Sequence, residues 1–396
     1  MSYKHKIKSK LPRGLIPLAR GIYRLSSIPK YWIPYNLYNG RAANPTTLHF
    51  EITYKCNQSC LMCPQSFEKQ KEFSKLRQVV KRSEELSFEE IKNLVEESCQ
   101  LGVRYFTLTG GEPFLRKDLL KVTGFIKEKG MVASILTNGS LLTREGAETL
   151  VKQKVDAVQF SLDGPKEIHN LIRNTKNAYD GLIHGINFCI EEKKRAKSIT
   201  PYLSVSCTIS SLNAGKLTEI FDIALRYNID INFGYLFYTT QDMREKTKSL
   251  FPLGEAKIED QDIPESLKSV DIDLLVEEVK EIKERIKNVP IKVRFSPPLK
   301  LKDIEKRFND DNFVYADKCF YPWYALRINP YGEVYPCSMG VKMGNIMEES
   351  LLNIWNGEEY IRFRKALRKE KIFPKCSKCC KLDKKLWSWL PKIPFK

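Results

Sequence analysis

The stretch LHFEITYKCNQSCLMC, residues 48–63, joins a β-strand pattern to three cysteines that fall within eight residues. Apolar and polar residues alternate along its first half, which is the two-residue period of a strand with one apolar and one polar face. The apolar positions are Leu48, Phe50 and Ile52, and the polar positions are His49, Glu51 and Thr53. Cys56, Cys60 and Cys63 follow, with no fourth cysteine nearby. The stretch therefore predicts a strand that ends in a loop carrying three thiols.

The length of the chain, 396 residues of which 42% are hydrophobic, is enough for a large core and for more than one ordinary domain. No apolar run reaches the ~18 residues that a membrane-spanning helix needs. The basic amino-terminal segment is interrupted by Pro17 and Arg20, unlike the core of a signal peptide. We therefore expect a cytoplasmic protein.

Eleven cysteines in the cytoplasm indicate metal binding rather than disulfides, because that compartment keeps thiols reduced. Eight of them form two groups, with Cys56, Cys60 and Cys63 in one and Cys319, Cys337, Cys376, Cys379 and Cys380 in the other. The remaining three, Cys99, Cys189 and Cys207, stand alone in apolar surroundings, and we expect them to be small core side chains.

The net charge of +18 is concentrated at the two ends of the chain. Residues 1–50 carry +9 and residues 361–396 carry +11, so the middle is nearly neutral at −2. Both ends also carry aromatic side chains, namely Tyr23, Tyr31, Trp32 and Tyr35 at one and Trp387, Trp389 and Phe395 at the other. Such segments can lie on an anionic membrane surface, which would make the protein peripheral to the membrane. A solvated tail beside the core explains the same composition, and nucleic acid is the least favoured partner.

Six β-rich runs alternate with helical patterns between residues 46 and 240. The β-rich runs are 47–54, 103–110, 131–138, 156–163, 202–209 and 230–237, and the helical patterns are 87–101, 117–129, 144–154, 179–195 and 214–227. Strand–helix alternation predicts an α/β fold with a parallel sheet. Six units predict a partial (β/α)6 TIM-like barrel rather than a full barrel of eight.

Three further segments flank this α/β core. Residues 1–45 form a basic, aromatic amino-terminal extension, and residues 241–315 contain a linker and a helix over 270–288. Residues 316–396 form a smaller cysteine-rich domain with a basic tail, in which a hairpin turns at 330–332.

The expected core strands have one apolar and one polar face. In residues 202–209 the apolar positions are Leu203, Val205, Cys207 and Ile209, and the polar positions are Ser204, Ser206 and Thr208. The apolar faces must meet the helices, so the polar faces line the interior of the barrel. A purely structural barrel fills its interior with apolar side chains. The polar interior therefore indicates a polar ligand, and it places Cys207 outside the site.

The three-thiol loop follows the first strand, so it lies at the carboxyl rim, where barrel enzymes keep their chemistry. Three thiolates can hold three irons of a [4Fe–4S] cluster, because each cysteine binds one iron. The fourth iron is then open to a small-molecule ligand. The alternative, a structural zinc ion, takes four ligands in a closed tetrahedron.

The CX3CX2C spacing after the first strand resembles the radical S-adenosylmethionine (SAM) superfamily, and three further motifs extend the resemblance over residues 46–240. TGGEP at 109–113 resembles the family's Gly-Gly-Glu-Pro element, which holds the SAM amino group. LTNGS at 136–140 and SLDGP at 161–165 resemble its segments near the SAM ribose. Arg173 stands where relatives set a cation for the SAM carboxylate, and Met62 replaces an aromatic residue that many relatives carry.

The resemblance implies that the first cysteine group holds the [4Fe–4S] cluster that binds SAM. The SAM-binding residues that it implies are Gly110, Gly111, Glu112, Pro113, Asn138, Ser161, Asp163 and Arg173. The two glycines would let the backbone approach a ligand closely, and Glu112 would offer an anion to the ammonium group. No general base or other catalytic residue is assigned.

The second cysteine group resembles the SPASM/twitch type of carboxyl-terminal domain, in which a C-x9–15-G-x4-C hairpin carries two ligands. Five cysteines are too few for the two clusters of a full SPASM domain, so the resemblance implies one auxiliary [4Fe–4S] cluster. The ligands that we expect are Cys319, Cys337, Cys376 and Cys379, with Cys380 as a substitute for Cys379 or as a free thiol. A structural zinc ion is the alternative.

The resemblance also implies the reaction. The enzyme would reductively cleave SAM to a 5′-deoxyadenosyl radical and abstract hydrogen from a substrate, with ferredoxin or flavodoxin as the electron donor. The substrate stays open between a peptide and a small alcohol, sugar or lipid-linked molecule. Residues 1–45 are too short and too basic for the usual leader-peptide-binding domain, and the basic aromatic ends favour membrane-bound material. A third hypothesis, a non-catalytic electron carrier, leaves the SAM-binding residues without a purpose.

Overall fold

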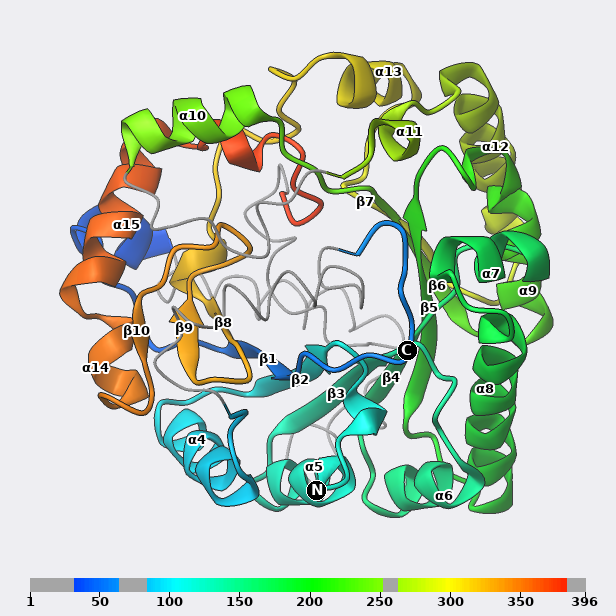
Figure 1. Cartoon of the computed structure of the whole chain (residues 1–396), viewed down its shortest axis with the longest axis horizontal. Coiled ribbons are helices and arrows are strands. Elements are labelled where there is room, and N and C mark those ends of the chain that lie inside the picture. The colour runs from blue at the N-terminus through cyan, green and yellow to red at the C-terminus, as the bar shows by residue number, and fades with distance from the viewer. Residues whose placement is uncertain (1–31, 64–83, 252–262, 383–396) are drawn as a thin grey trace, which may run out of the picture.

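The computed structural model describes residues 32–63, 84–251 and 263–382. Its centre is a curved sheet of ten strands in the order β10-β9-β8-β1-β2-β3-β4-β5-β6-β7, with helices along its outer side (Figure 1). The strands are β1 Thr47–Thr53, β2 Tyr105–Gly110, β3 Val132–Thr137, β4 Ala157–Ser161, β5 Tyr202–Ile209, β6 Asp230–Tyr235, β7 Val293–Ser296, β8 Ala325–Ile328, β9 Glu333–Tyr335 and β10 Gly344–Asn345. Each neighbouring pair from β8 to β7 is parallel, and the predicted partial barrel is confirmed.

The helices follow the predicted alternation and add several short elements. Those near predicted positions are α4 Phe88–Gln100, α5 Leu119–Glu128, α6 Arg144–Lys152, α8 Ala178–Arg195, α9 Leu217–Arg226 and α12 Ile272–Arg285. The sequence patterns missed α7 Lys166–Arg173, α10 Gln241–Leu250, α11 Glu265–Lys268 and α13 Leu301–Asn309. The cysteine-bearing segment contains two further helices, α14 Leu351–Trp355 and α15 Glu358–Glu370.

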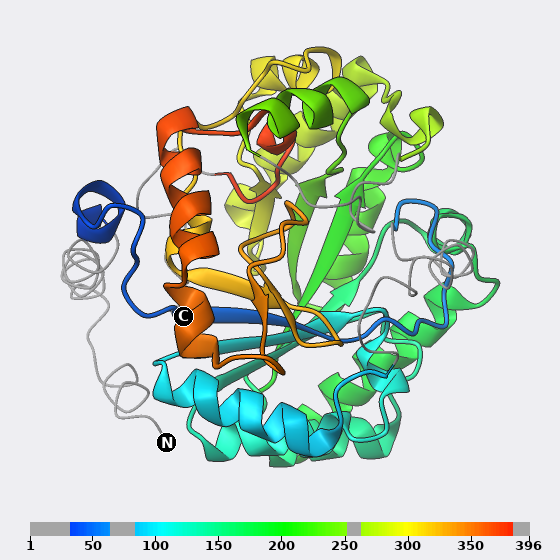
Figure 2. The same ribbon diagram turned by 60° about the vertical axis from the view of Figure 1, so that its left-hand side comes forward.

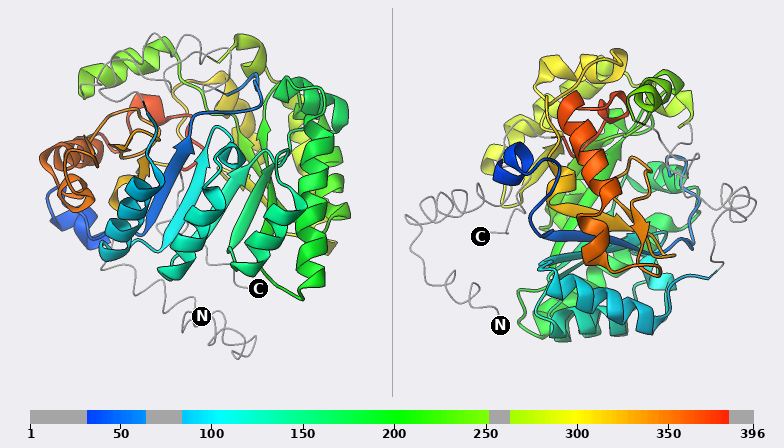
Figure 3. Two further views of the ribbon diagram at one scale, coloured as in Figure 1. Left: turned by 60° about the horizontal axis from the view of Figure 1, so that its bottom comes forward. Right: turned by 90° about the vertical axis from the view of Figure 1, so that its left-hand side faces the viewer.

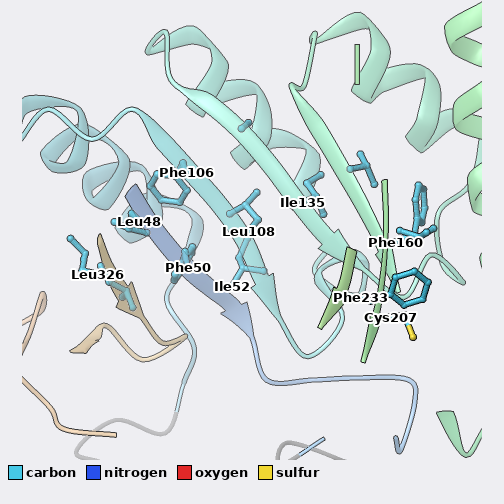
Figure 4. Packing of buried hydrophobic residues seen from close by; sticks show 14 of the residues in the cluster. Leu48, Phe50, Ile52, Phe106, Leu108, Ile135, Phe160, Cys207, Phe233 and Leu326 are labelled. Atoms are coloured by element: carbon cyan, nitrogen blue, oxygen red, sulfur yellow. The ribbon is translucent and has the colours of Figure 1, made fainter. Parts of the chain in front are cut away.

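The apolar core lies between the sheet and its outer helices. In strands β1 to β6 the fully buried side chains come from alternate positions, and Figure 4 shows several of them along neighbouring strands, including Phe50, Phe106, Ile135, Phe160 and Phe233. In β5 the buried and partly exposed residues alternate without a break. The predicted division into an apolar outer face and a polar inner face is therefore confirmed, and Cys207 is buried in the outer core.

The sheet extends beyond the six predicted strands at both edges. On one edge β7 pairs with β6, within the segment expected to be a linker and a helix. On the other edge β8 pairs with β1, and the hairpin β8–β9 turns at Gly332, whose φ is +84°. The second cysteine group is therefore built onto the edge of the core sheet, beside helix α15 (Figure 2).

Part of the amino-terminal basic segment packs into the protein core, which the sequence did not predict. Tyr35 is buried and packs its ring 4.4 Å from that of Phe320 and 4.7 Å from that of Trp323, so it is a core residue rather than a surface aromatic. Trp32 is 43% exposed. The aromatic residues Tyr23, Tyr31, Trp387, Trp389 and Phe395 lie outside the described residues, so membrane-surface contact stays a prediction. In the described ranges, none of the helices combines the length and the apolar character that crossing a bilayer requires.

Arg364 of α15 joins separate parts of the cysteine-bearing segment through buried hydrogen bonds. Its guanidinium is fully buried and donates to the carbonyl oxygens of Pro322 (2.8 Å) and Trp355 (2.9 Å). It also lies 4.2 Å from the ring centroid of Trp355 and 4.4 Å from that of Tyr360. Burial lowers the pKa of Arg364 to about 9, because its charge is removed from water and the oxygens that accept from it are neutral.

Replacing Arg364 with alanine is expected to lower the free energy of unfolding by about 3 kcal/mol, because buried carbonyl groups lose their donors and a cavity forms. Urea unfolding of the purified protein measures this difference. Arg362→Ala is the matched control, since Arg362 is half exposed, pairs with Glu359 three residues earlier and lies 4.7 Å from the ring centroid of Phe251; its loss should stay within about 1 kcal/mol. Equal losses for the two variants would contradict this account of Arg364.

Candidate functional site

The first cysteine group lies at the carboxyl rim of the sheet, as predicted. Strands β1 to β4 run parallel, so the loops that follow them meet at one edge (Figure 3, left). Cys60 is buried, and Cys56 and Cys63 are partly exposed. The amide of Leu61 donates to the carbonyl of Ile172 (2.9 Å), which fastens the loop to helix α7.

The thiols of this loop are surrounded by hydrogen-bond donors. The amide of Gln58 donates to Cys56 Sγ at 3.5 Å, and Nη1 of Arg173 donates to Cys60 Sγ at 3.6 Å. Burial raises the pKa of Cys56 to about 11, so the free thiol would stay protonated at neutral pH. Metal binding reverses this preference, because a metal ion binds the thiolate and displaces the proton.

Two buried donors beside these thiols have no hydrogen-bond partner among the described residues. They are Nε of Arg173 and Nε2 of Gln58, and both side chains are less than one-tenth exposed. A buried N–H group without an acceptor costs about 1–3 kcal/mol, and a ligand, ion or water molecule that accepts from it removes this cost. Sulfide or carboxylate acceptors would satisfy them, and the residues therefore fit an iron–sulfur cluster with SAM.

Gly110 and Gly111 allow the end of β2 to lie directly against the start of the cysteine loop. A Cβ at Gly110 would fall 2.2 Å from the carbonyl oxygen of Thr53, and one at Gly111 would fall 2.1 Å from that of Lys55. The amides of Gly111 and Glu112 donate to these same two oxygens, at 2.7 and 2.8 Å. The close approach that the sequence assigned to a ligand is thus made to the neighbouring backbone.

Glu112 connects the end of β2 to the end of β3. Its buried carboxylate accepts hydrogen bonds from Thr137 Oγ1 (2.7 Å), the amide of Asn138 (2.8 Å) and the amide of Phe114 (3.1 Å). Burial raises the pKa of Glu112, while these donors and Arg173 favour the charged form. Pro113 follows at the start of the short 3-10 helix Pro113–Leu115.

Asn138 connects this point to the cysteine loop. Its Nδ2 donates to Asn57 Oδ1 at 2.9 Å, and Asn57 Nδ2 donates to Ser140 Oγ at 2.9 Å. Sequence reasoning missed Asn57, because an asparagine between two cysteines carries no signal of its own.

Arg173 binds Asp163 and Cys60 in this structure. Its Nη2 forms an ion pair with Asp163, whose other carboxylate oxygen accepts from the amide of Thr208 at 2.8 Å. The amide of Asp163 donates to Nδ1 of His169 at 3.1 Å. The predicted cation for the SAM carboxylate therefore already has a protein partner, and only its Nε is left without one. Ser161 lies on the inner face of β4, opposite Ser206 of β5.

The second cysteine group gathers four thiols around the hairpin β8–β9. The pKa of Cys376 is raised well above its usual value by burial and then by the thiols of Cys337, Cys319 and Cys379, so all four are neighbours. Burial raises the pKa of Cys379 to about 12. The thiol of Cys380 contributes to the raised pKa of Cys379, and it partly offsets the lowering of the pKa of Arg307 by burial.

Within the described ranges, no three His, Cys, Asp or Glu side chains converge closely enough to hold a single metal ion. A [4Fe–4S] cluster does not need such convergence, because each thiolate binds a different iron.

Gly111→Ala is expected to release the first cluster and leave the second, because the added Cβ would push the cysteine loop off the end of β2. Iron per chain after anaerobic reconstitution should fall from about eight to about four. Gly234→Ala in β6 is the control, since its Cβ would meet no atom closer than 3.8 Å. Full iron in the Gly111 variant would show that the contact does not hold the loop.

Comparison with known proteins agrees with this arrangement. Residues 50–204 match the model of the radical SAM superfamily, and residues 319–380 match that of an iron–sulfur cluster-binding domain, SPASM. The chain is 25% identical over 341 residues to the AdoMet-dependent heme synthase of Methanosarcina barkeri, covering 85% of this chain and 88% of that one. It is 22% identical over 353 residues to the PqqA peptide cyclase of Rhizobium meliloti, covering 87% and 81%.

Two further similarities are partial or structural. The chain is 32% identical to the Fe-coproporphyrin III synthase of Methanosarcina barkeri over 190 residues, which are 48% of this chain and only 43% of that relative. The crystal structure of Streptococcus suis SuiB bound to S-adenosylmethionine shares the fold, with a TM-score of 0.58, 15% identity and coverage of 88% and 72%. The radical SAM domain implies a [4Fe–4S] cluster and SAM, and the SPASM domain implies auxiliary iron–sulfur binding. The chain belongs to the radical SAM superfamily and carries a carboxyl-terminal SPASM domain.

Proposed function

We propose that this protein is a radical SAM enzyme in which Cys56, Cys60 and Cys63 hold the SAM-binding cluster. When bound, a reduced [4Fe–4S] cluster and SAM supply a 5′-deoxyadenosyl radical, which can abstract hydrogen from an unreactive carbon. The observation that carries the proposal is the pair of buried, unpartnered donors on Arg173 and Gln58 beside the thiols. An electron donor such as ferredoxin or flavodoxin would supply the electron.

The chain's own residues have three tasks in this proposal. The contact of Gly110 and Gly111 with β1 positions the cysteine loop, and Glu112 and Asn138 keep the ends of β2 and β3 beside it. Asp163 holds Arg173 against Cys60, whose Sγ accepts a hydrogen bond from Nη1 of Arg173. The polar inner face, which includes Ser161 and Ser206, offers hydrogen bonds to the part of the ligand that enters the barrel.

We assign Cys319, Cys337, Cys376 and Cys379 to one auxiliary [4Fe–4S] cluster, with zinc as the alternative that the metal analysis distinguishes. The mutual influence of the four thiols supports this set. The substrate stays unassigned, because the relatives are named for a peptide cyclase and for heme synthesis.

Anaerobic reconstitution followed by dithionite and SAM tests the function. We expect about eight irons per chain, since two [4Fe–4S] clusters hold four each, and formation of 5′-deoxyadenosine. Cys60→Ala should lose about four irons and all 5′-deoxyadenosine. About four irons plus one zinc would remove the auxiliary cluster from the proposal. A wild-type protein with full iron that neither binds nor cleaves SAM would refute the enzyme.

The choice between the adjacent cysteines is tested with two single variants. Cys379→Ser is expected to lose about four irons per chain, whereas Cys380→Ser should keep all of them. Iron analysis and the electron paramagnetic resonance spectrum of the reduced protein give the result. The opposite outcome would make Cys380 the fourth ligand.

A further inference from the structure

A second polar cluster lies on the inner face of the sheet, between the two cysteine groups. We call it the inner-face cluster, and it consists of His49 of β1, Tyr321 and Lys381. His49 stands opposite Arg327 in the parallel register of β1 and β8. Its neighbours along the strand, Leu48 and Phe50, are fully buried in the outer core, so His49 faces the interior.

The side chains of the cluster contact one another. The rings of His49 and Tyr321 are stacked, with centroids 6.1 Å apart and planes at 26°. Nζ of Lys381 donates to the hydroxyl of Tyr321 at 3.2 Å and lies 4.5 Å from the centroid of the same ring. Lys381 also acts on the pKa of His49, which places the ammonium group near the imidazole.

Lys381 carries a positive charge that no carboxylate of the described residues neutralises. Among the described residues, the contacts of its Nζ are those with Tyr321, and these leave at least one of its three N–H donors unused. Glu51, the acidic residue on the same face of β1, is already engaged by Arg327 and by the hydroxyl of Tyr54 (3.1 Å). Lys381 also keeps solvent-exposed surface, so a ligand can reach it.

His49 is the second unused group. Its ring nitrogens make no hydrogen bond within the described part of the chain, although the ring is closely surrounded. Burial, then Lys381 and then Arg327 keep the pKa of His49 well below its usual value, so the imidazole is neutral at pH 7. A neutral imidazole donates one N–H and accepts at its other nitrogen.

We propose that Lys381 and His49 form a subsite for an anionic group of the substrate, a carboxylate or a phosphate. Lys381 supplies the charge, and the imidazole N–H and the hydroxyl of Tyr321 supply hydrogen bonds. Tyr321 and Lys381 lie two residues from Cys319 and Cys379, and His49 lies on the strand that leads to Cys56. An anchored substrate would therefore be held between the two cysteine groups. That the bound anion belongs to a substrate rests on the proposed function, whereas anion binding itself does not.

Binding of two simple anions to the iron-reconstituted protein tests the subsite. Inorganic phosphate and succinate are titrated separately, without SAM or reductant, and binding is followed by 31P and 13C line broadening of the anion. We expect saturable binding of at least one of them, at least fivefold weaker in Lys381→Gln. Lys369→Gln is the control, because the side chain of Lys369 is 85% exposed on α15, and it should bind as the wild type does.

The preference between the two anions distinguishes a phosphate-bearing from a carboxylate-bearing substrate. His49→Phe serves as a second variant if Lys381→Gln loses iron, and it should also weaken binding. If the wild type binds neither anion, or if the variants bind as well as the wild type, the subsite is refuted, and Lys381 then serves only to balance the charge of the auxiliary site. Because SAM is absent from the assay, this result is independent of whether 5′-deoxyadenosine is formed.

Discussion

The site depends on a contact between two backbones that leaves no room for a side chain. The end of β2 lies against the carbonyl oxygens of Thr53 and Lys55, and only glycine at 110 and 111 permits it. Beside this contact, the carboxylate of Glu112 accepts a hydrogen bond from the amide of Asn138 at the end of β3. The side chain of Asn138 in turn donates to Asn57 in the cysteine loop. Steric exclusion thus fixes the position of the first three thiols, and the hydrogen bonds then maintain it.

The charged groups at this rim are buried, which is costly unless they are paired. Asp163 and Arg173 pair with each other, and Arg173 extends this pair to a thiol. Burial raises the pKa of Glu112, and its three hydrogen-bond donors together with the charge of Arg173 partly offset that effect. Two of the buried donors that have no partner among the described residues, Nε of Arg173 and Nε2 of Gln58, belong to residues beside the thiols of Cys56 and Cys60. This arrangement of buried charges and donors fits a group bound at the thiols.

Much of this could be predicted from the sequence, because its strongest signals are periodic. The alternation in β1 and β5 gave the strands and their inner faces, and the cysteine spacing gave the chemistry. The short strand β7 could not be found, since four residues do not establish a period. The pairing of β8 with β1 joins residues about 280 positions apart, and no local pattern encodes that. The ion pair of Arg173 with Asp163 and the contacts of His49 with Tyr321 and Lys381 could not be predicted either, because they depend on residues that only the fold brings together.

The placement of β8 beside β1 has a consequence for electron transfer. One neighbour of β1 is β2, whose end supports the first cysteine loop, and the other is β8, whose hairpin leads to Cys337. Separating the two cysteine groups would require breaking the hydrogen-bond ladder between adjacent strands of a ten-stranded sheet. The ladder between β1 and β8 therefore opposes a hinge motion between these strands, and it would hold centres bound at the two groups at a nearly fixed separation. Exchange of a substrate at the rim would then leave the tunnelling distance between the centres unchanged.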